Sequence, residues 1–334
     1  MATTRLSDLF VPQIFGPTAF QESVRVNKLV SSGAIALSPG LSANLAGGGI
    51  AFNAPYFGSI VDTASPAFVP NDDPTDIAVA KKIGTLNQVS IRLMRNNAYA
   101  VMDVASILSG TDPMARITSE IGAAINDVRQ SALLNILACT VNETRAANLV
   151  NTIGVEIVGS QTAATKLSGG AFIESLSGWG DAASDMSNLT IMMHSDTYRK
   201  LAADNLIVYS APAGQVMGFS TYLGARVIVD DSMPKRAGST SGFVYTTYVM
   251  RNGAIQLGTA SVDTPVELER SALIGNTGGG ETITWRDMFA YHVNGFSWAG
   301  GVAAVPTDAA LATAANWTKV YNDKQIGIVS IIHN

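Results

Sequence analysis

Residues 112–142 read DPMARITSEIGAAINDVRQSALLNILACTVN and decide the architecture of this chain. The stretch opens on Asp112, a residue type favoured at helix N-caps, and continues with Pro113 at the first helical position. Apolar residues then recur at three- and four-residue spacing and form one continuous stripe: Met114, Ile117, Ile121, Ile125, Val128, Ala132, Ile136 and Cys139. The pattern predicts a single helix roughly 40 Å long, well above the usual helix length.

The rest of the chain is mostly β-like, so a rod of this length indicates an architectural protein rather than an enzyme. The chain has 334 residues, of which 47% are hydrophobic and only 14% are charged. Two interpretations fit this composition: a subunit covered by neighbours on several sides, or a compact globular protein with an unusually neutral surface. We favour the first, because large exposed apolar areas usually mark partner surfaces.

The charge distribution does not favour a nucleic-acid-binding surface. The net charge is −5, and adjacent basic residues occur only as isolated pairs, at Lys81–Lys82, Arg199–Lys200 and Lys235–Arg236. A sequence-independent nucleic-acid binder normally carries a basic patch. Any nucleic acid near this protein is therefore expected to be enclosed rather than gripped.

The sequence predicts neither secretion nor a membrane span. The first ten residues, MATTRLSDLF, lack the apolar run of a signal peptide. No stretch approaches the roughly 18 uncharged apolar residues that a spanning helix needs. We therefore expect a soluble protein that stays inside the cell in which it is made.

Residues 1–46 form a low-charge arm without a sustained hydrophobic period. Prolines interrupt its apolar residues, which are Leu9, Phe10, Val11, Ile14, Phe15 and Phe20. Such a segment is expected to contribute little to the subunit's own core and to lie on its own domain or on a neighbour.

Residues 50–95 are predicted to form a long two-stranded excursion. Apolar residues alternate with polar ones in its second half, at Ile83, Val89, Ile91 and Leu93. An acidic turn with Asp72, Asp73 and Asp76 forms its tip. A lone hairpin is marginally stable in water, so this one needs to lie against something else.

Shorter elements complete the prediction. Helices are expected at 97–108, 170–186, 195–202 and 308–315, with Ser195 or Asp196 as the cap of the third. Strands are expected at 155–158, 189–194, 222–234, 243–250, 254–260, 266–270, 282–298, 316–320 and 326–332.

The residue patterns do not indicate an active site, a cofactor site or a metal site. The single cysteine, Cys139, lies on the apolar stripe, where it is expected to be a small buried hydrophobe. His194, His292 and His333 are far apart and have no second ligand at metal-binding spacing. Residues 238–242 place Thr240 where a nucleophile elbow needs serine, and the glycines at 275–280 lack the Gly-Lys-Ser/Thr ending of a phosphate loop.

The order of these elements resembles that of the major capsid proteins of tailed phages with the Hong Kong 97-like (Johnson) fold. The local sequence agrees with this order. The segments that carry the resemblance are SGTDPMARI (109–117), IMMHSDTYRKL (191–201), YLGARVIVDDSMP (222–234), ETITWRDMFAYHVNGFSW (281–298) and NWTKVYNDKQIGIV (316–329). The resemblance covers essentially the whole chain, and its specificity lies in the order rather than in any single motif.

The resemblance implies an α+β fold with four parts. Residues 1–46 become the N-arm and 47–96 the extended loop. Residues 97–150 together with 259–334 become the peripheral domain, which holds the long spine helix, and 151–258 the axial domain. The implied function is a shell of hexamers and pentamers that forms the icosahedral head around double-stranded DNA. The shell would be assembled in the host cytoplasm and carried in the virion.

The resemblance also implies partners. The main partner is further copies of the chain, with intersubunit contacts expected at Arg5, Phe10, Phe15, Phe20, Asp72, Asp73, Asp76, Lys81 and Lys82. A separate scaffolding protein and a portal are expected during assembly, because the chain begins without a cleaved scaffolding segment, and a decoration protein is possible in this family. A Lys–Asn crosslink of the family's best-known member is not carried over to Lys81 or Lys82. Two alternatives stay open at this point: an encapsulin-type nanocompartment shell and a β-rich hydrolase.

Overall fold

The computed structural model describes seven parts of the chain: residues 34–57, 69–77, 85–153, 164–183, 188–210, 219–238 and 242–334. Several predicted features fall outside these parts, namely Arg5, Phe10, Phe15, Phe20, Lys81, Lys82 and the strand at 155–158. No helix within the described parts is both long enough and apolar enough to cross a membrane.

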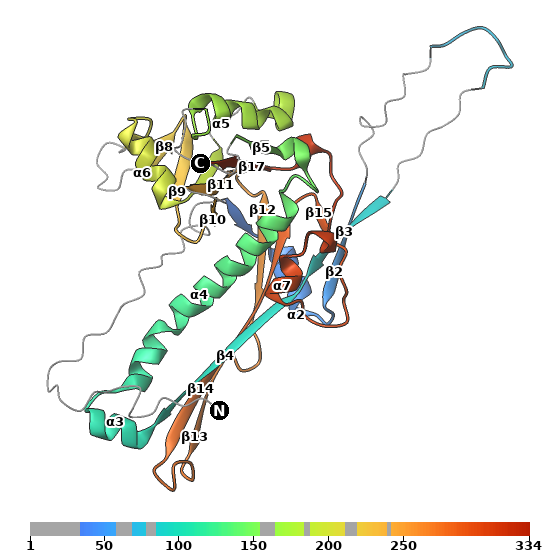
Figure 1. The fold of residues 1–334 in the computed structure, drawn as a ribbon. Coiled ribbons are helices and arrows are strands. Elements are labelled where there is room, and N and C mark those ends of the chain that lie inside the picture. The colour runs from blue at the N-terminus through green and yellow to red at the C-terminus, as the bar shows by residue number, and fades with distance from the viewer. Residues whose placement is uncertain are drawn as a thin grey trace.

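The long helix is present as predicted and forms the spine of the molecule (Figure 1). It is α4 (Pro113–Thr140), and the Asp112 carboxylate caps it by accepting a hydrogen bond of 3.0 Å from the Ala115 amide. Pro113 occupies the first turn, where its missing N–H needs no partner. Local sequence therefore sets the start of this helix.

The apolar stripe of α4 serves two different cores. Ile121 is buried against Ile283 and Trp285, with Ile125 and Val128 packed at the margin of the same cluster. Farther along, Ala132, Ile136 and Cys139 enter the large core between the two main sheets. The stripe is therefore buried at Ile121, whereas Ile125 is only half buried.

The first sheet follows the spine helix. Its order is β1 (Ile35–Leu37), β12 (Ile255–Ala260), β14 (Gly280–Val293) and β13 (Val266–Ser271), and β4 (Leu93–Met102) also pairs with β14. β14 is the central strand, since β12 pairs with its last part while β13 and β4 flank its first part. The elongated lower half of Figure 1 contains much of the spine helix together with β4, β13 and β14 of this sheet.

The predicted helix at 97–108 is wrong in its first half. Residues up to Met102 belong to β4, and only α3 (Asp103–Ser109) is helical. Tyr99 pairs with Ile283 and Ala100 with Thr282 on β14, so a backbone ladder to a strand about 180 positions away overrides local propensity. Gly110, with a φ of 64°, ends α3 in the left-handed conformation.

The expectation that the arm contributes little to the core is wrong for residues 34–46. Ala34 and Ile35 are buried in the main core, and β1 runs parallel to β12. In α2 (Pro39–Ala46), Leu41 and Leu45 are buried in a second cluster. Gly258 on β12 permits this close approach, because a Cβ there would lie 2.7 Å from the Leu41 side chain. The first 33 residues lie outside the described parts.

The second sheet forms the upper body in Figure 1. Its order is β5 (Val150–Thr152), β17 (Ile328–His333), β11 (Phe243–Arg251), β6 (Leu189–Met193), β9 (Ala225–Val229), β8 (Phe219–Tyr222) and β7 (Val208–Ser210), and β10 (Lys235–Ala237) also pairs with β11. Two helices lie between its strands in sequence, α5 (Gly169–Ser175) after β5 and α6 (Ser195–Ala203) after β6. β17 reaches this sheet from the C-terminal segment that was assigned to the peripheral domain, so the two sheets are interleaved in sequence.

Smaller elements complete the fold. The helix predicted at 170–186 is α5 followed by a 3-10 segment (Leu176–Ala183) that is kinked at Gly180. β15 (Phe296–Trp298) pairs with β16 (Trp317–Lys319), and α7 (Asp308–Leu311) lies between them in sequence. Short 3-10 turns occur at Ala147–Leu149, Ala314–Asn316 and Asp323–Gln325.

The predicted excursion is a hairpin at its base. β2 (Ala51–Phe57) pairs antiparallel with β3 (Thr85–Ile91), and the two strands form a sheet of their own. The described tip, residues 69–77, lies beyond the open end of this hairpin and away from the body (Figure 1).

Candidate assembly surfaces

The acidic tip is a compact turn that holds its own shape. Asn71 donates to Asp76 at 2.6 Å, and the Thr75 hydroxyl and amide donate to one oxygen of Asp73 at 2.7 and 2.8 Å. These bonds from Thr75 lower the pKa of Asp73. All nine residues from 69 to 77 are exposed, so the turn presents its carboxylates to solvent.

Large apolar side chains accompany these carboxylates. Val69 and Ile77 flank the turn, and both are more than 80% exposed. On the hairpin itself Phe57 and Leu86 are also exposed. An isolated subunit gains nothing from placing such side chains in water, so the excursion has the composition of a partner-binding element.

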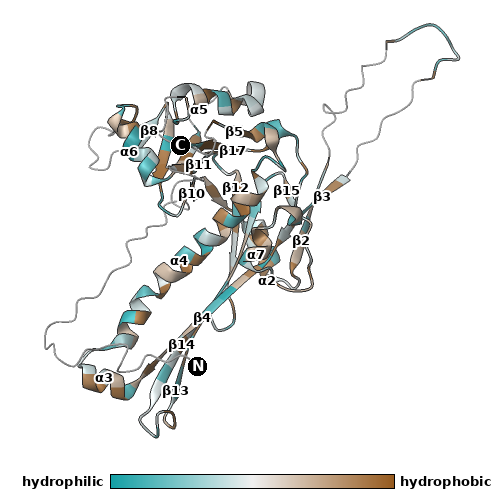
Figure 2. Cartoon of the chain, viewed as in Figure 1, coloured by the Kyte–Doolittle hydropathy of each residue, from teal (hydrophilic) through white to brown (hydrophobic). Residues whose placement is uncertain are grey.

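A distal apolar patch lies at the end of the molecule opposite the second sheet. It comprises Val104, Ile107 and Leu108 on α3, with Leu273 and Ile274 in the loop between β13 and β14. Ile107 is 76% exposed and Leu273 is 80% exposed. The three α3 residues have i, i+3, i+4 spacing and therefore share one face of the helix, and Figure 2 colours much of α3 as hydrophobic.

The loop and α3 form one continuous surface. The Asp103 amide donates to the Gly279 carbonyl at 3.1 Å, and a Cβ at Gly278 would come within 2.9 Å of Val104. An ion-pair rim borders this surface, where Arg270 bridges Asp103 at 2.6 Å and Glu281 at 2.5 Å. An apolar centre with a polar rim is the usual anatomy of a protein interface.

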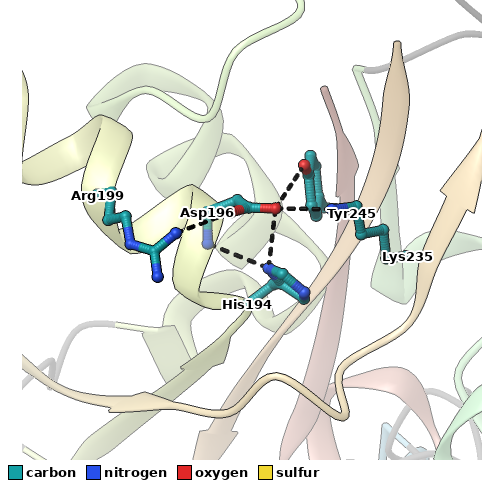
Figure 3. Close-up of polar contacts among 5 residues, drawn as sticks. All are labelled: His194, Asp196, Arg199, Lys235 and Tyr245. Atoms are coloured by element: carbon teal, nitrogen blue, oxygen red, sulfur yellow. Dashed lines mark hydrogen bonds and ion pairs between the residues drawn. The ribbon is translucent and has the colours of Figure 1, made fainter.

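A polar cluster connects the helix α6 to the strands β10 and β11 of the second sheet (Figure 3). One oxygen of Asp196 accepts hydrogen bonds from Lys235 at 2.8 Å and from the Tyr245 hydroxyl at 3.1 Å, and the other accepts from Arg199 at 3.2 Å. The Lys235 hydrogen bond is the main cause that lowers the pKa of Asp196. His194 caps α6, because its Nδ1 accepts from the Asp196 amide at 3.0 Å.

This cluster holds the edge strand β10 against α6 and β11. Lys235 also lies over the ring of Phe243, 4.2 Å from its centroid. The predicted cap at Ser195 or Asp196 is wrong by one residue: the cap is His194, an imidazole that takes the place of the usual hydroxyl or carboxylate. We interpret the cluster as a structural cross-tie.

The chemistry of the described residues offers no reactive centre. Those residues contain no group of three metal-ligating side chains. Cys139 is buried, and burial raises the pKa of its thiol, which makes it a poor nucleophile. What the chain displays instead are surfaces: an acidic turn, an apolar hairpin and a distal apolar patch.

Comparison with known proteins identifies the family to which the chain belongs. A family model described as Gp13-like, Major capsid protein 13-like, matches residues 21–327. The chain belongs to this family of major capsid proteins. It is also 31% identical over 338 residues to the major capsid protein of Bacillus phage SPP1, covering 100% of this chain and 99% of that relative.

Solved structures show the same fold. The chain superposes on the cyanophage Pam1 capsid with a TM-score of 0.64 at 13% identity, covering 100% of this chain and 99% of that one. The capsid of Ralstonia phage GP4 gives a TM-score of 0.58 at 8% identity, with coverage of 96% and 95%. The capsid protein thus has the α+β Hong Kong 97-like fold that its sequence resembles, and it is a structural component of a tailed-phage virion rather than an enzyme.

The structure describes only part of the predicted contact set. Asp72, Asp73 and Asp76 lie together on one exposed turn of the capsid protein. The other six predicted contacts, Arg5, Phe10, Phe15, Phe20, Lys81 and Lys82, fall outside the described parts. Sequence reasoning missed the distal apolar patch, although the spacing of Val104, Ile107 and Leu108 carried a signal for an amphipathic face.

Proposed function

We propose that the capsid protein forms hexamers and pentamers that close into an icosahedral head around double-stranded DNA. Assembly from copies of the chain follows from its family. The observation that supports the finer statement is the separation of its exposed apolar surfaces. Phe57 on the hairpin and Ile107 on α3 lie on opposite arms of the subunit, so one subunit can engage several neighbours (Figure 1).

The predicted division into domains is part of this proposal. The peripheral domain would consist of residues 97–150 and 259–334 and the axial domain of 151–258, with β17 completing the axial sheet. The N-arm (1–46) and the extended loop (47–96) would carry the intersubunit contacts. Because Ala34, Ile35, Leu41 and Leu45 are buried in the subunit, the contact-making part of the arm would be its first 33 residues.

Further partners are proposed from the resemblance alone. A separate scaffolding protein and a portal would take part in assembly in the host cytoplasm, and the family also allows a decoration protein on the finished shell. The DNA would be enclosed without sequence-specific contacts, in keeping with a net charge of −5.

The proposal is tested by assembling the purified protein with its scaffold and imaging the product by negative-stain microscopy. The wild-type protein should yield closed shells. The variants Ile107→Asp and Leu273→Asp should melt like the wild type, because exposed substitutions change stability by only about 0.5 kcal/mol. Both should abolish shells.

Val302→Asp is the matched control, since Val302 is an exposed apolar residue outside the three surfaces. It should assemble normally. A wild-type protein that stays monomeric or dimeric with scaffold present would contradict the proposal. Normal shells from both patch variants would show that the distal apolar patch is not needed for assembly.

A further inference from the structure

The extended loop departs from the subunit at a place where a backbone ladder ends. β4 pairs with β14 as far as Leu93, which lies opposite Phe289. β3 ends two residues earlier, at Ile91, and pairs with β2 alone, whereas β14 continues to Val293. The hairpin is therefore not joined to the central strand by strand pairing.

Side chains bridge this gap. His292, near the end of β14, contacts two residues of β3: its Nδ1 lies 2.8 Å from the Ser90 hydroxyl and its Nε2 lies 2.5 Å from Gln88 Oε1. Gln88 and Ser90 are two positions apart and share one face of the strand. All three side chains are buried.

The donors and acceptors of this group are fixed by its chemistry. The amide oxygen of Gln88 can only accept, so His292 Nε2 carries the hydrogen. Burial lowers the pKa of His292 to about 4, so the ring is neutral near pH 7 and its Nδ1 accepts a hydrogen bond from the Ser90 hydroxyl. Both ring nitrogens are thus satisfied in a single orientation of the imidazole.

The intervening residue is held as well. The Val89 amide donates to the Ser297 hydroxyl on β15 at 2.9 Å. Three consecutive residues of β3 are therefore held by side-chain hydrogen bonds from the peripheral domain. Hydrogen bonds are directional, whereas apolar contact at the same place would tolerate sliding and rotation of the hairpin.

We propose that His292 is a positioning residue for the extended loop: through Gln88 and Ser90 it sets the direction in which the loop leaves the subunit and hence where the tip meets a neighbouring copy. The inference rests on the proposed role of the loop as an intersubunit contact. The contribution of His292 is geometric. A fully hydrogen-bonded polar group in a core selects one arrangement of the chain and adds little net stability.

The decisive variant separates geometry from stability. Replacing all three groups by apolar ones, in Gln88→Leu/Ser90→Ala/His292→Leu, leaves no orphaned polar atom, so melting should stay near that of the wild type. Hydrogen exchange of the β2 and β3 amides should nevertheless accelerate about tenfold, with α4 unchanged. Shell yield with scaffold should fall about tenfold, or the shells should be misshapen.

A matched control uses the other buried histidine with a hydroxyl partner. His333 Nε2 lies 2.9 Å from the Thr247 hydroxyl within the second sheet, far from the loop. His333→Leu/Thr247→Val removes an equivalent group and should leave hairpin exchange and shell geometry unchanged. Normal shells from the control but not from the triple variant would support the positioning role.

The milder variant Ser90→Ala keeps the test informative if the triple variant does not fold. It removes one bond to His292 and should accelerate exchange in β2 and β3 only. Wild-type shells from a folded triple variant, or hairpin exchange unchanged in Ser90→Ala, would overturn the inference. Failure of the wild-type protein itself to form shells would instead count against the proposed function.

Discussion

Arg129 on the spine helix and Asp287 on the central strand β14 form a two-pronged ion pair. Arg129 Nε lies 2.7 Å from one carboxylate oxygen of Asp287, and Nη2 lies 2.6 Å from the other. The hydrogen bonds to Asp287 are the main cause that raises the pKa of Arg129. The guanidinium also lies over the Phe289 ring at 5.6 Å, so this pair fixes how the helix sits on the strand.

Removing one partner of this pair should destabilise the subunit strongly. Arg129→Ala leaves the buried Asp287 carboxylate without its cation, which should cost about 3–5 kcal/mol of unfolding free energy. The double variant Arg129→Leu/Asp287→Leu should recover most of the loss, because no charge stays buried. Urea unfolding measures both, and equal losses in the single and double variants would contradict the pairing argument.

Burial of the helix stripe predicts a second stability effect. Ile121→Asp would place an unpaired charge against Ile283 and Trp285 and should cost several kcal/mol, about 3 or more. Thr118→Asp, one turn earlier on the exposed face, is the control and should have little effect. A soluble Ile121→Asp protein that assembles normally would show that this part of the stripe is not core.

Acid should destabilise the capsid protein through two buried histidines. Burial lowers the pKa of both His292 and His333 to about 4, from an ordinary value of 6.5. Between these values the unfolded chain binds protons that the folded chain does not. Stability therefore falls as the pH drops from 6.5 towards 4, by up to about 3 kcal/mol for each group, and then levels off.

Urea midpoints measured from pH 7.5 to pH 4 test this slope. His292→Asn and His333→Asn should each flatten the profile, even where they lower stability at pH 7. A profile of unchanged slope in the double variant would assign the acid sensitivity to other groups.

The acidic tip should matter for assembly and not for folding. Asp72→Lys/Asp73→Lys changes only exposed residues, so circular dichroism and melting of the subunit should stay nearly intact. Shells should be lost if these carboxylates meet basic residues of a neighbour, since reversed charge there is repulsive. Thr118→Asp and Val302→Asp serve as assembly controls.

Deleting residues 1–20 should have the same pattern of effects, with a folded subunit and no shells. The deletion stops short of Ala34, the first described residue of the arm, which is buried. Unfolding of the isolated subunit by either change would place the arm or the tip in the intramolecular core.

The local sequence was sufficient to predict the elements whose backbone hydrogen bonds are made mainly between residues close together in the chain. α4 begins at its cap Asp112 and at Pro113, and its apolar residues repeat with a period of 3.6 residues. Both signals lie within one continuous stretch of sequence. Alternation at Val89 and Ile91 also indicated the second strand of the hairpin, β3, whose partner β2 lies nearby in the sequence. The order of such elements was enough to indicate the capsid fold and with it the function.

Other features needed partners far away in the chain. Residues 97–102 are strand because β14 supplies their hydrogen bonds. Ile35 and Leu41 are buried because β12 pairs with β1 and because Gly258 leaves room for the Leu41 side chain. The exposure of the patch around Ile107 and the position of His292 between Gln88 and Ser90 likewise depend on residues up to about 200 positions apart. A helix satisfies its own backbone within four residues, so its sequence suffices, whereas a strand, a burial or a side-chain bridge is defined by what the rest of the chain places beside it.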